Sequence, residues 1–443
     1  MNRWSEQEGE RPPAGIDKPS AAAVTDGPKG GDGALPSEAT IKDPTTRGRD
    51  LPGEGEGIAG AYDGVPVSGG LQAEPPAEPS TEPSTEPYGS GLAAADRGGV
   101  YGALDLGTNN CRLLLARPSR RGFRVIDAFS RIIRLGEGVS QTGRLSDAAM
   151  ERTFAALRIC AGKIARGNVR RARCVATEAC RVAENGQAFL GRVRDALGLD
   201  IEILDRKTEA SLAVSGCTSL IDYRVDYVLV FDIGGGSSEL IWLDLTRWGE
   251  RGRNALIERL ETQTAIAAWT SLPVGVVTLA ERFGGHHVAP EGFEAMVDHV
   301  IELIGPFELA HDFRSRISGK SIHLLGTSGT VTTVAGILLK LPRYDRARVD
   351  GCWLDVTDVR NVTYGLLAKS YEERVAEPCI GLERADLVLA GCAILEALLR
   401  VWPCRRLRVA DRGLREGILS MLMSEDGLYG AGRRPRDGAR PGR

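Results

Sequence analysis

The chain has 443 residues, a net charge of −3 and nine cysteines, and this composition excludes several classes of protein. No stretch is long and apolar enough to predict a transmembrane helix, and no two cysteines form the C-x-x-C pair that is typical of zinc sites. Most cysteines stand in apolar runs, which favours buried free thiols in a reducing cytoplasm over disulfides.

The first segment of the chain, residues 1–97, differs from the rest. It is acidic and rich in Gly, Pro, Ser and Glu, with a short repeat over 77–87. Such a segment cannot bury enough apolar surface to offset its ordering entropy, so we predict a disordered acidic tail. It also has no apolar run like that of a secretory signal, which again favours a cytoplasmic protein. A disordered basic tail is predicted over 426–443.

The next part of the chain opens on three predicted strands, at 101–106, 112–116 and 123–129, which form a meander. Ser146 then caps a long helix with an apolar face, which ends near residue 165. Alternating elements follow: a strand at 173–176, a helix at 187–197, a strand at 201–204 and a helix at 208–220.

The pattern then restarts. A strand at 227–233 leads through a glycine-rich turn to a strand at 239–243, and Phe231-Asp-Ile-Gly-Gly-Gly repeats the form of Leu104-Asp-Leu-Gly-Thr-Asn. An internal repeat on this scale predicts two similar lobes with a cleft between them. We place lobe I at 98–222 and lobe II at 223–425, with the final helix a candidate to return to lobe I.

The remaining elements complete lobe II. They are a strand at 323–325 followed by a helix from 329, a helix at 384–401, a strand at 407–410 and a helix at 413–423. Residues 248–269 show no clear pattern and are interpreted as an insertion between strands.

Three loops at strand ends are rich in Gly, Ser, Thr and Asn. Glycines let backbone N–H groups approach an anion closely, and hydroxyl groups add further donors. One such loop is usually an ordinary turn, but three of them favour phosphate binding. The candidate phosphate-binding residues are Gly107, Thr108, Asn109, Gly234, Gly235, Gly236, Ser237, Ser238, Gly326, Thr327, Ser328, Gly329 and Thr330.

Asp105 and Asp232 stand at the start of two of these loops, and Glu239 follows on the returning strand. Carboxylates beside a phosphate cradle would repel phosphate unless a hard cation lay between them, which predicts Mg²⁺, with Mn²⁺ as the alternative ion. The competing interpretation is that Asp105 and Asp232 only stabilise their turns.

Seven ordered motifs together resemble those of the exopolyphosphatase and guanosine pentaphosphatase (Ppx/GppA) family. The motifs are Asp105-Leu-Gly-Thr-Asn-Asn, Ala176-Thr-Glu-Ala-Cys-Arg181, Asp232-Ile-Gly-Gly-Gly-Ser-Ser-Glu239, Leu272-Pro-Val-Gly, Gly326-Thr-Ser-Gly-Thr330, Glu383-Arg-Ala-Asp386 and Asp411-Arg-Gly-Leu-Arg-Glu-Gly417. The resemblance covers about residues 99–424. It implies the actin, Hsp70 and sugar-kinase superfamily, an α/β fold with two actin-like (ribonuclease H-like) lobes.

The resemblance also implies catalytic roles. It places the family's water-activating glutamate on Glu209, at a helix N-terminus where the dipole favours the ionised carboxylate. It places a phosphate-facing arginine on Arg181. Thr208 and Glu209 stand where the family usually has a pair of glutamates, so whether Thr208 alters the activity is left open.

The expected activity is therefore hydrolysis of the terminal phosphate of polyphosphate, with pppGpp as a second substrate. No nucleic-acid or membrane partner is expected, and the oligomeric state is left open, with a homodimer among the alternatives. Arginine pairs at 120–121, 170–171 and 405–406 are expected to line the approach to the cleft. A kinase of the same superfamily and a non-catalytic sensor of guanosine polyphosphates remain as alternative functions.

Overall fold

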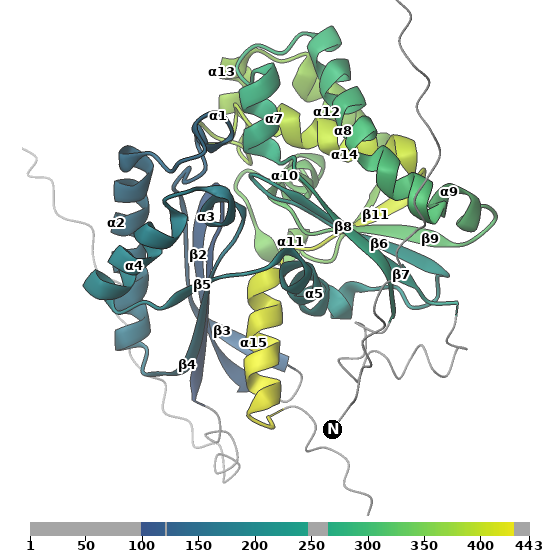
Figure 1. Ribbon diagram of the computed structural model, residues 1–443. Coiled ribbons are helices and arrows are strands. Elements are labelled where there is room, and N and C mark those ends of the chain that lie inside the picture. The colour runs from purple at the N-terminus through teal and green to yellow at the C-terminus, as the bar shows by residue number, and fades with distance from the viewer. Residues whose placement is uncertain (1–98, 120–121, 247–264, 429–443) are drawn as a thin grey trace, which may run out of the picture. The chain divides into compact units, whose positions relative to one another are not determined.

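The computed structural model of the chain describes residues 99–119, 122–246 and 265–428 (Figure 1). The predicted acidic tail, the arginine pair at 120–121, most of the expected insertion at 248–269 and most of the basic tail lie outside these residues. All nine cysteines lie inside them and are free thiols. None of the described helices has an apolar stretch long enough to cross a bilayer.

The first sheet has five strands in the order β3-β2-β1-β4-β5. The three predicted meander strands pair antiparallel, and the other two are parallel to β1. The strands are β1 (Val100–Leu106), β2 (Asn110–Ser119), β3 (Gly122–Ile132), β4 (Val169–Ala176) and β5 (Ile201–Ile203). β1 is buried on both faces, which explains its nearly continuous apolar sequence.

The second sheet has six strands in the order β10-β11-β9-β6-β7-β8. They are β6 (Tyr227–Ile233), β7 (Ser238–Asp244), β8 (Ile266–Leu272), β9 (Ile322–Gly326), β10 (Trp353–Asp355) and β11 (Arg406–Val409). From β8 to β11 this sheet repeats the first: three antiparallel meander strands, then two strands parallel to the central one. The internal repeat predicted from the sequence is therefore present as two equivalent sheets. The residue limits given for the two lobes stay a prediction.

Helices cover both faces of the first sheet. On one face lie α2 (Asp147–Arg166) and α4 (Gly186–Leu197), with the short α1 (Val139–Thr142) and α3 (Glu178–Val182) beside them (Figure 1). The Ser146 hydroxyl accepts a hydrogen bond from the Ala149 amide at 3.2 Å, as expected for the predicted cap of α2. On the other face lies the last helix, α15 (Leu414–Glu425), which shares a core with β1.

The second sheet carries a larger helical layer on one face, built around α14, which is buried at every position except Arg400. Its helices are α7 (Val276–Phe283), α8 (Pro290–His311), α9 (Phe313–Arg316), α10 (Gly329–Leu338), α11 (Arg346–Val349), α12 (Val356–Leu367), α13 (Tyr371–Val375) and α14 (Val388–Val401). The helix predicted from residue 384 begins only at Val388, because residues 381–387 form turns, with the Leu387 amide bonded to the Arg384 carbonyl.

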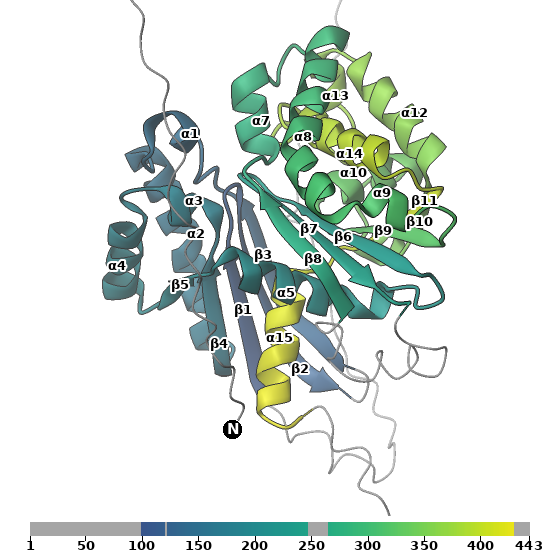
Figure 2. The same ribbon diagram turned by 45° about the vertical axis from the view of Figure 1, so that its right-hand side comes forward.

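One helix, α5 (Arg206–Cys217), contributes to the cores of both halves of the chain (Figure 2). Its Val214 packs with the second sheet, whereas Leu212 packs with β1 and α15. Helices α5 and α15 touch through their backbones: a Cβ atom on Gly216 would lie 2.0 Å from the Gly413 carbonyl oxygen, and one on Gly417 would lie 2.0 Å from that of Leu212. Only glycine fits at these two positions.

Candidate active site

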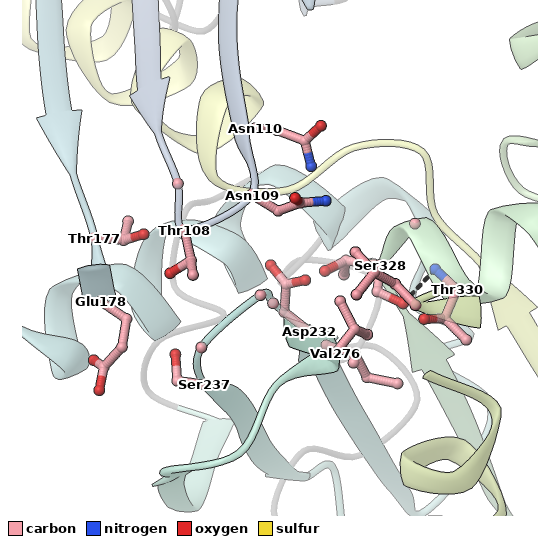
Figure 3. A pocket seen from close by; sticks show the side chains of 18 of the residues that line it. Thr108, Asn109, Asn110, Thr177, Glu178, Asp232, Ser237, Val276, Ser328 and Thr330 are labelled. Carbon is pink, nitrogen blue, oxygen red and sulfur yellow. Dashed lines mark hydrogen bonds between the residues drawn. The ribbon is translucent and has the colours of Figure 1, made fainter. Parts of the chain in front are cut away.

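A pocket of about 150 Å³ lies where β1, β6 and β9 end, and all three loops predicted to bind phosphate line it (Figure 3). The lining includes most of the predicted residues: Asp105, Gly107, Thr108, Asn109, Glu209, Asp232, Gly234, Gly235, Gly236, Ser237, Glu239, Thr327, Ser328, Gly329 and Thr330. The pocket therefore brings together residues that are far apart in the sequence and belong to both sheets.

The two loops that begin with aspartate pack directly against each other. A Cβ atom on Gly235 would lie 2.8 Å from Cβ of Thr108, and one on Gly236 would lie 3.1 Å from Oγ1 of Thr108. Each loop is closed by a short backbone bond, from the Gly107 amide to the Asn110 carbonyl and from the Gly234 amide to the Ser237 carbonyl, both at 2.9 Å. A side chain would have no room at this contact, so only glycine fits there. The backbone of these glycines therefore forms part of the pocket surface.

The third loop leads into the ten-residue helix α10. The Ser328 hydroxyl caps this helix and accepts hydrogen bonds from the Thr330 and Val331 amides at 3.2 and 3.4 Å. The positive end of the helix dipole therefore faces the pocket where Gly329 and Thr330 line it, which favours an anionic ligand.

Two of the predicted phosphate-binding residues do not line the pocket. The Ser238 hydroxyl is buried and donates to the Val274 carbonyl at 2.7 Å. Gly326 lies beneath Phe231, whose Cζ would be 2.6 Å from an added Cβ atom. Both residues make structural contacts at the strand ends, and neither is in a position to touch a ligand in this pocket.

Five carboxyl groups line the pocket, and the pKa is raised for four of them, Asp105, Glu209, Asp232 and Glu239. Burial is the largest cause in every case. The pKa of Asp232 rises to about 7, with the charge of Glu239 as the second cause. The pKa of Glu209 is raised by burial and, second, by the charge of Glu239. The pKa of Asp105 is also raised by burial, although the charges of Arg112 and Arg415 act to lower it. The four carboxylates thus resist ionising together.

A divalent cation would relieve this repulsion, and the oxygen atoms that line the pocket are suitable ligands for a hard cation. Among the described residues no group of three or more His, Cys, Asp or Glu side chains could hold a metal by itself. The buried Oδ1 atoms of Asn109 and Asn110 have no hydrogen-bond partner there either. Oxygen donors that form only part of a coordination shell suit Mg²⁺, which is commonly held by one or two carboxylates, waters and substrate phosphates.

Arg181 does not line the pocket but lies behind Glu209. Its guanidinium donates to Oε2 of Glu209 at 2.5 Å, to Oε2 of Glu178 at 2.7 Å and to the Leu204 carbonyl at 2.9 Å. The predicted phosphate-facing role therefore has no support in this geometry, because the planar fork is already occupied by protein acceptors. Arg181 instead fixes the orientation of the Glu209 carboxylate and leaves Oε1 without a donor among the described residues.

Several residues that line the pocket were not predicted. Arg112 is the clearest: it pairs in register with Asp105 on β1 and β2, as Glu239 pairs with Asp232 on β6 and β7. The equal spacing of seven residues in the two repeats could have identified it. Arg112 and Arg384 form no ion pair within the described part of the chain. The other unpredicted lining residues are Asn110, Thr177, Glu178, Ile233, Val276, Thr333, Leu387, Val388 and Leu414.

Comparisons with known proteins give consistent results. A sequence model described as the Ppx/GppA phosphatase family matches residues 115–425. A guanosine-5'-triphosphate,3'-diphosphate pyrophosphatase from Photobacterium profundum is 27% identical over 338 residues, which span 74% of this chain and 60% of that protein. The solved structure of the Aquifex aeolicus PPX-GPPA enzyme aligns with a TM-score of 0.58 at 27% identity, over 73% of this chain and 99% of its own.

A more distant structure, an exopolyphosphatase from Cytophaga hutchinsonii, aligns with a TM-score of 0.63 at 23% identity, over 74% of this chain and 98% of its own. It supports the fold. Together with the repeated strand order of the two sheets, these likenesses confirm the α/β fold with two actin-like lobes that the sequence predicted.

Proposed function

Because the chain belongs to the Ppx/GppA phosphatase family, we propose that it hydrolyses the terminal phosphoanhydride bond of inorganic polyphosphate, with pppGpp as a second substrate. The observation that carries this proposal is the meeting of three Gly- and hydroxyl-rich loops with the buried Glu209 carboxylate in one pocket. A sensor would need the loops alone, whereas a carboxylate held by Arg181 beside them suits the activation of water.

In this proposal the loops bind the terminal phosphate through backbone amides and hydroxyl groups, and Arg112, which has no ion-pair partner among the described residues, lies beside it. A water molecule hydrogen-bonded to Oε1 of Glu209 attacks the terminal phosphorus atom in line with the bridging oxygen. The new P–O bond forms as the bridging P–O bond breaks, and Glu209 accepts the proton of the water. The products are orthophosphate and a chain shorter by one phosphate.

We propose Asp232 and Glu239 as the groups that hold a Mg²⁺ ion, with Asp105 nearby and Mn²⁺ as the alternative ion. The ion would neutralise phosphate charge in the pocket. Glu239 is oriented by the hydroxyl groups of Ser237 and Ser271, which donate to its Oε1 at 2.8 and 2.9 Å. A cytoplasmic location is likewise proposed, supported by nine free cysteines.

The test is the release of orthophosphate from polyphosphate, from pppGpp and from ATP, each with Mg²⁺ and with a chelator. Metal-dependent release from polyphosphate or pppGpp, lost in Glu209→Gln, is the expected result. Tight binding of pppGpp with no phosphate release would favour the sensor, and transfer of the γ-phosphate of ATP to an acceptor would favour the kinase. Glu184→Gln, an exposed change on the first half of the chain, is the matched control.

A further inference from the structure

Three of the four described arginines that the sequence offered as an approach to the cleft make other contacts, and the fourth, Arg405, is 89% exposed and lies 4.0 Å from Asp355. Arg170 and Arg171 form ion pairs with Asp426 just beyond the end of α15, and Arg171 also pairs with Glu425. Arg406 stacks on the ring of Trp353, with its guanidinium carbon 5.1 Å from the ring centre. None of these residues lines the pocket. A long polyanion would have to be held by other cations.

A second concave site offers them. It is a hollow of about 440 Å³ lined by Leu341, Pro342, Arg343, Tyr344, Asp345, Arg346 and Arg348, called the 341–348 hollow here. Arg343 and Arg348 are exposed and form no ion pair with any described residue. The one acidic residue of the hollow, Asp345, is engaged as a cap, because its Oδ1 accepts a hydrogen bond from the Ala347 amide at 2.9 Å. The hollow therefore carries an excess of positive charge.

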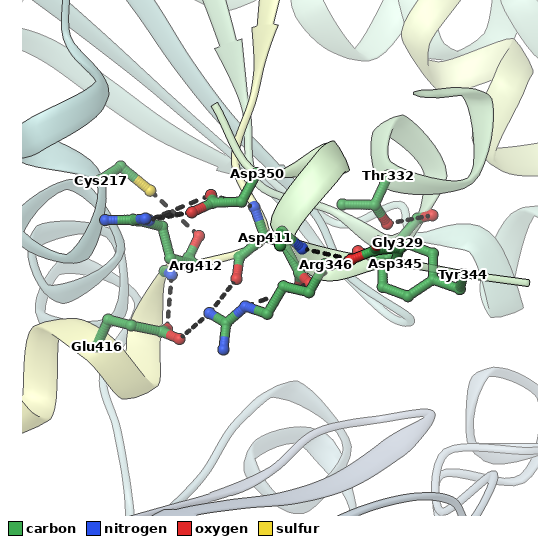
Figure 4. A network of polar contacts seen from close by, with 12 residues as sticks. Cys217, Gly329, Thr332, Tyr344, Asp345, Arg346, Asp350, Asp411, Arg412 and Glu416 are labelled. Carbon is green, nitrogen blue, oxygen red and sulfur yellow. Dashed lines mark hydrogen bonds and ion pairs between the residues drawn. The ribbon is translucent and has the colours of Figure 1, made fainter. Parts of the chain in front are cut away.

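The hollow adjoins the pocket through a network of polar contacts (Figure 4). The Tyr344 hydroxyl donates to Oδ2 of Asp411 at 2.7 Å, and Nη2 of Arg346 donates to Oε1 of Glu416 at 2.8 Å. Glu416 lies in the first turn of α15, two residues after Leu414, which lines the pocket. The same network therefore fixes one wall of the hollow and one wall of the pocket.

Arginines continue from the pocket toward the hollow. Arg415 forms no ion pair with the described residues, and the charges of Arg112, which lines the pocket, and of Arg346, which lines the hollow, both act on it. Burial lowers the pKa of Arg415, and the charges of Arg112 and Arg346 lower it further against the opposing charges of Glu416 and Asp105.

We propose that the 341–348 hollow binds phosphates of a long polyphosphate chain whose terminal phosphate occupies the pocket, and that it thereby sets a preference for long chains. The inference rests on the proposed function and extends it to substrate length. We expect the hollow to contribute less to the binding of tripolyphosphate and pppGpp, which carry fewer phosphates than a long chain.

The experiment compares wild-type protein with the double variant Arg343→Gln/Arg348→Gln, which removes two exposed charges. The control is Arg192→Gln/Arg194→Gln, which removes the same charge from exposed positions on α4. KM and kcat are measured for long-chain polyphosphate, tripolyphosphate and pppGpp across a salt series. The expected result is a roughly tenfold higher KM for the long chain in the hollow variant alone, with kcat unchanged. Its KM should also depend less steeply on salt.

An unchanged KM for the long chain, or an equal loss for long and short substrates, would overturn the proposal. Direct binding of long-chain polyphosphate, followed by calorimetry with wild-type and both double variants, separates this inference from the proposed function. If no substrate is hydrolysed, weaker polyphosphate binding by the hollow variant alone still supports the hollow as a binding site. Equal polyphosphate binding by all three proteins refutes the proposal.

Discussion

Arg134 and Asp386, which are 252 residues apart, form a two-point ion pair with N···O distances of 2.8 and 3.1 Å. The pair joins the segment after β3 to the segment before α14. A second contact lies close by, where the Gly138 amide donates to Oε1 of Glu281 at 2.7 Å. Arg384, two residues before Asp386, lines the pocket. These contacts therefore link the first half of the chain to a pocket-lining segment of the second.

We predict a measurable coupling within this pair. In a double-mutant cycle of Arg134→Met and Asp386→Asn, the coupling in the free energy of unfolding should be about 1–2 kcal/mol, because the pair is bidentate and partly buried. Urea denaturation of the four proteins gives the value. The exposed pair of Arg152 and Glu137 is the control and should give less than about 0.5 kcal/mol. Equal coupling in both pairs would show that the Arg134 contact is no stronger than a surface pair.

Glu209→Gln should lower kcat by roughly two orders of magnitude or more, as expected for the loss of a general base. The amide is nearly isosteric, so the helix should persist and the circular dichroism spectrum should match wild-type. Glu184→Gln should retain full activity. Near wild-type turnover in purified Glu209→Gln protein would remove this residue from the mechanism.

Asp232→Asn and Glu239→Gln should each raise the Mg²⁺ concentration needed for half-maximal activity. A single Mg²⁺ held by few protein ligands loses affinity when one carboxylate becomes an amide. Activity is titrated against Mg²⁺ at saturating substrate. If the half-saturating concentration is the same as in wild-type for both variants, these two residues do not hold the ion.

Metal-free protein should lose stability as the pH rises. The ordinary pKa of an aspartate, which applies to Asp232 in the unfolded chain, is 3.8, whereas its pKa in the folded protein is about 7. Between these pH values the folded state therefore binds more protons than the unfolded state. The free energy of unfolding should therefore fall by roughly 3 kcal/mol from about pH 5 to about pH 8. Asp232→Asn should flatten this dependence, as measured by urea denaturation with a chelator. A stability that rises with pH in the wild-type protein and not in the variant would contradict the assignment.

Much of the fold could be read from the sequence because the strands are strongly apolar and the two repeats share a register. The strand at 227–233 has the predicted bounds, and the meander strands differ from the predictions only in length. The helices α7, α8 and α12 were not predicted, although α8 has 22 residues. They lie between the recognised motifs, where only apolar spacing could have shown them.

The candidate site was predictable as far as its loops, since glycine and hydroxyl groups at strand ends are visible in the sequence. The orientation of the long side chains in the site could not be predicted from the sequence. Arg181 turns toward Glu178 and Glu209, and Arg112 turns into the pocket from a strand that reads as plain β structure. Which way a guanidinium points depends on the acceptors that tertiary contacts bring near it.

The backbone contact between α5 and α15 has a consequence for how sequence variation in this protein should be interpreted. Gly216 and Gly417 do not line the pocket, but any side chain there would push apart the helix that carries Glu209 and the helix that begins at Leu414. In a saturation-mutagenesis screen for activity, both positions should accept glycine alone and would rank beside catalytic residues. An intolerant position in this chain can therefore mark a lack of space for a side chain rather than a role in the chemistry.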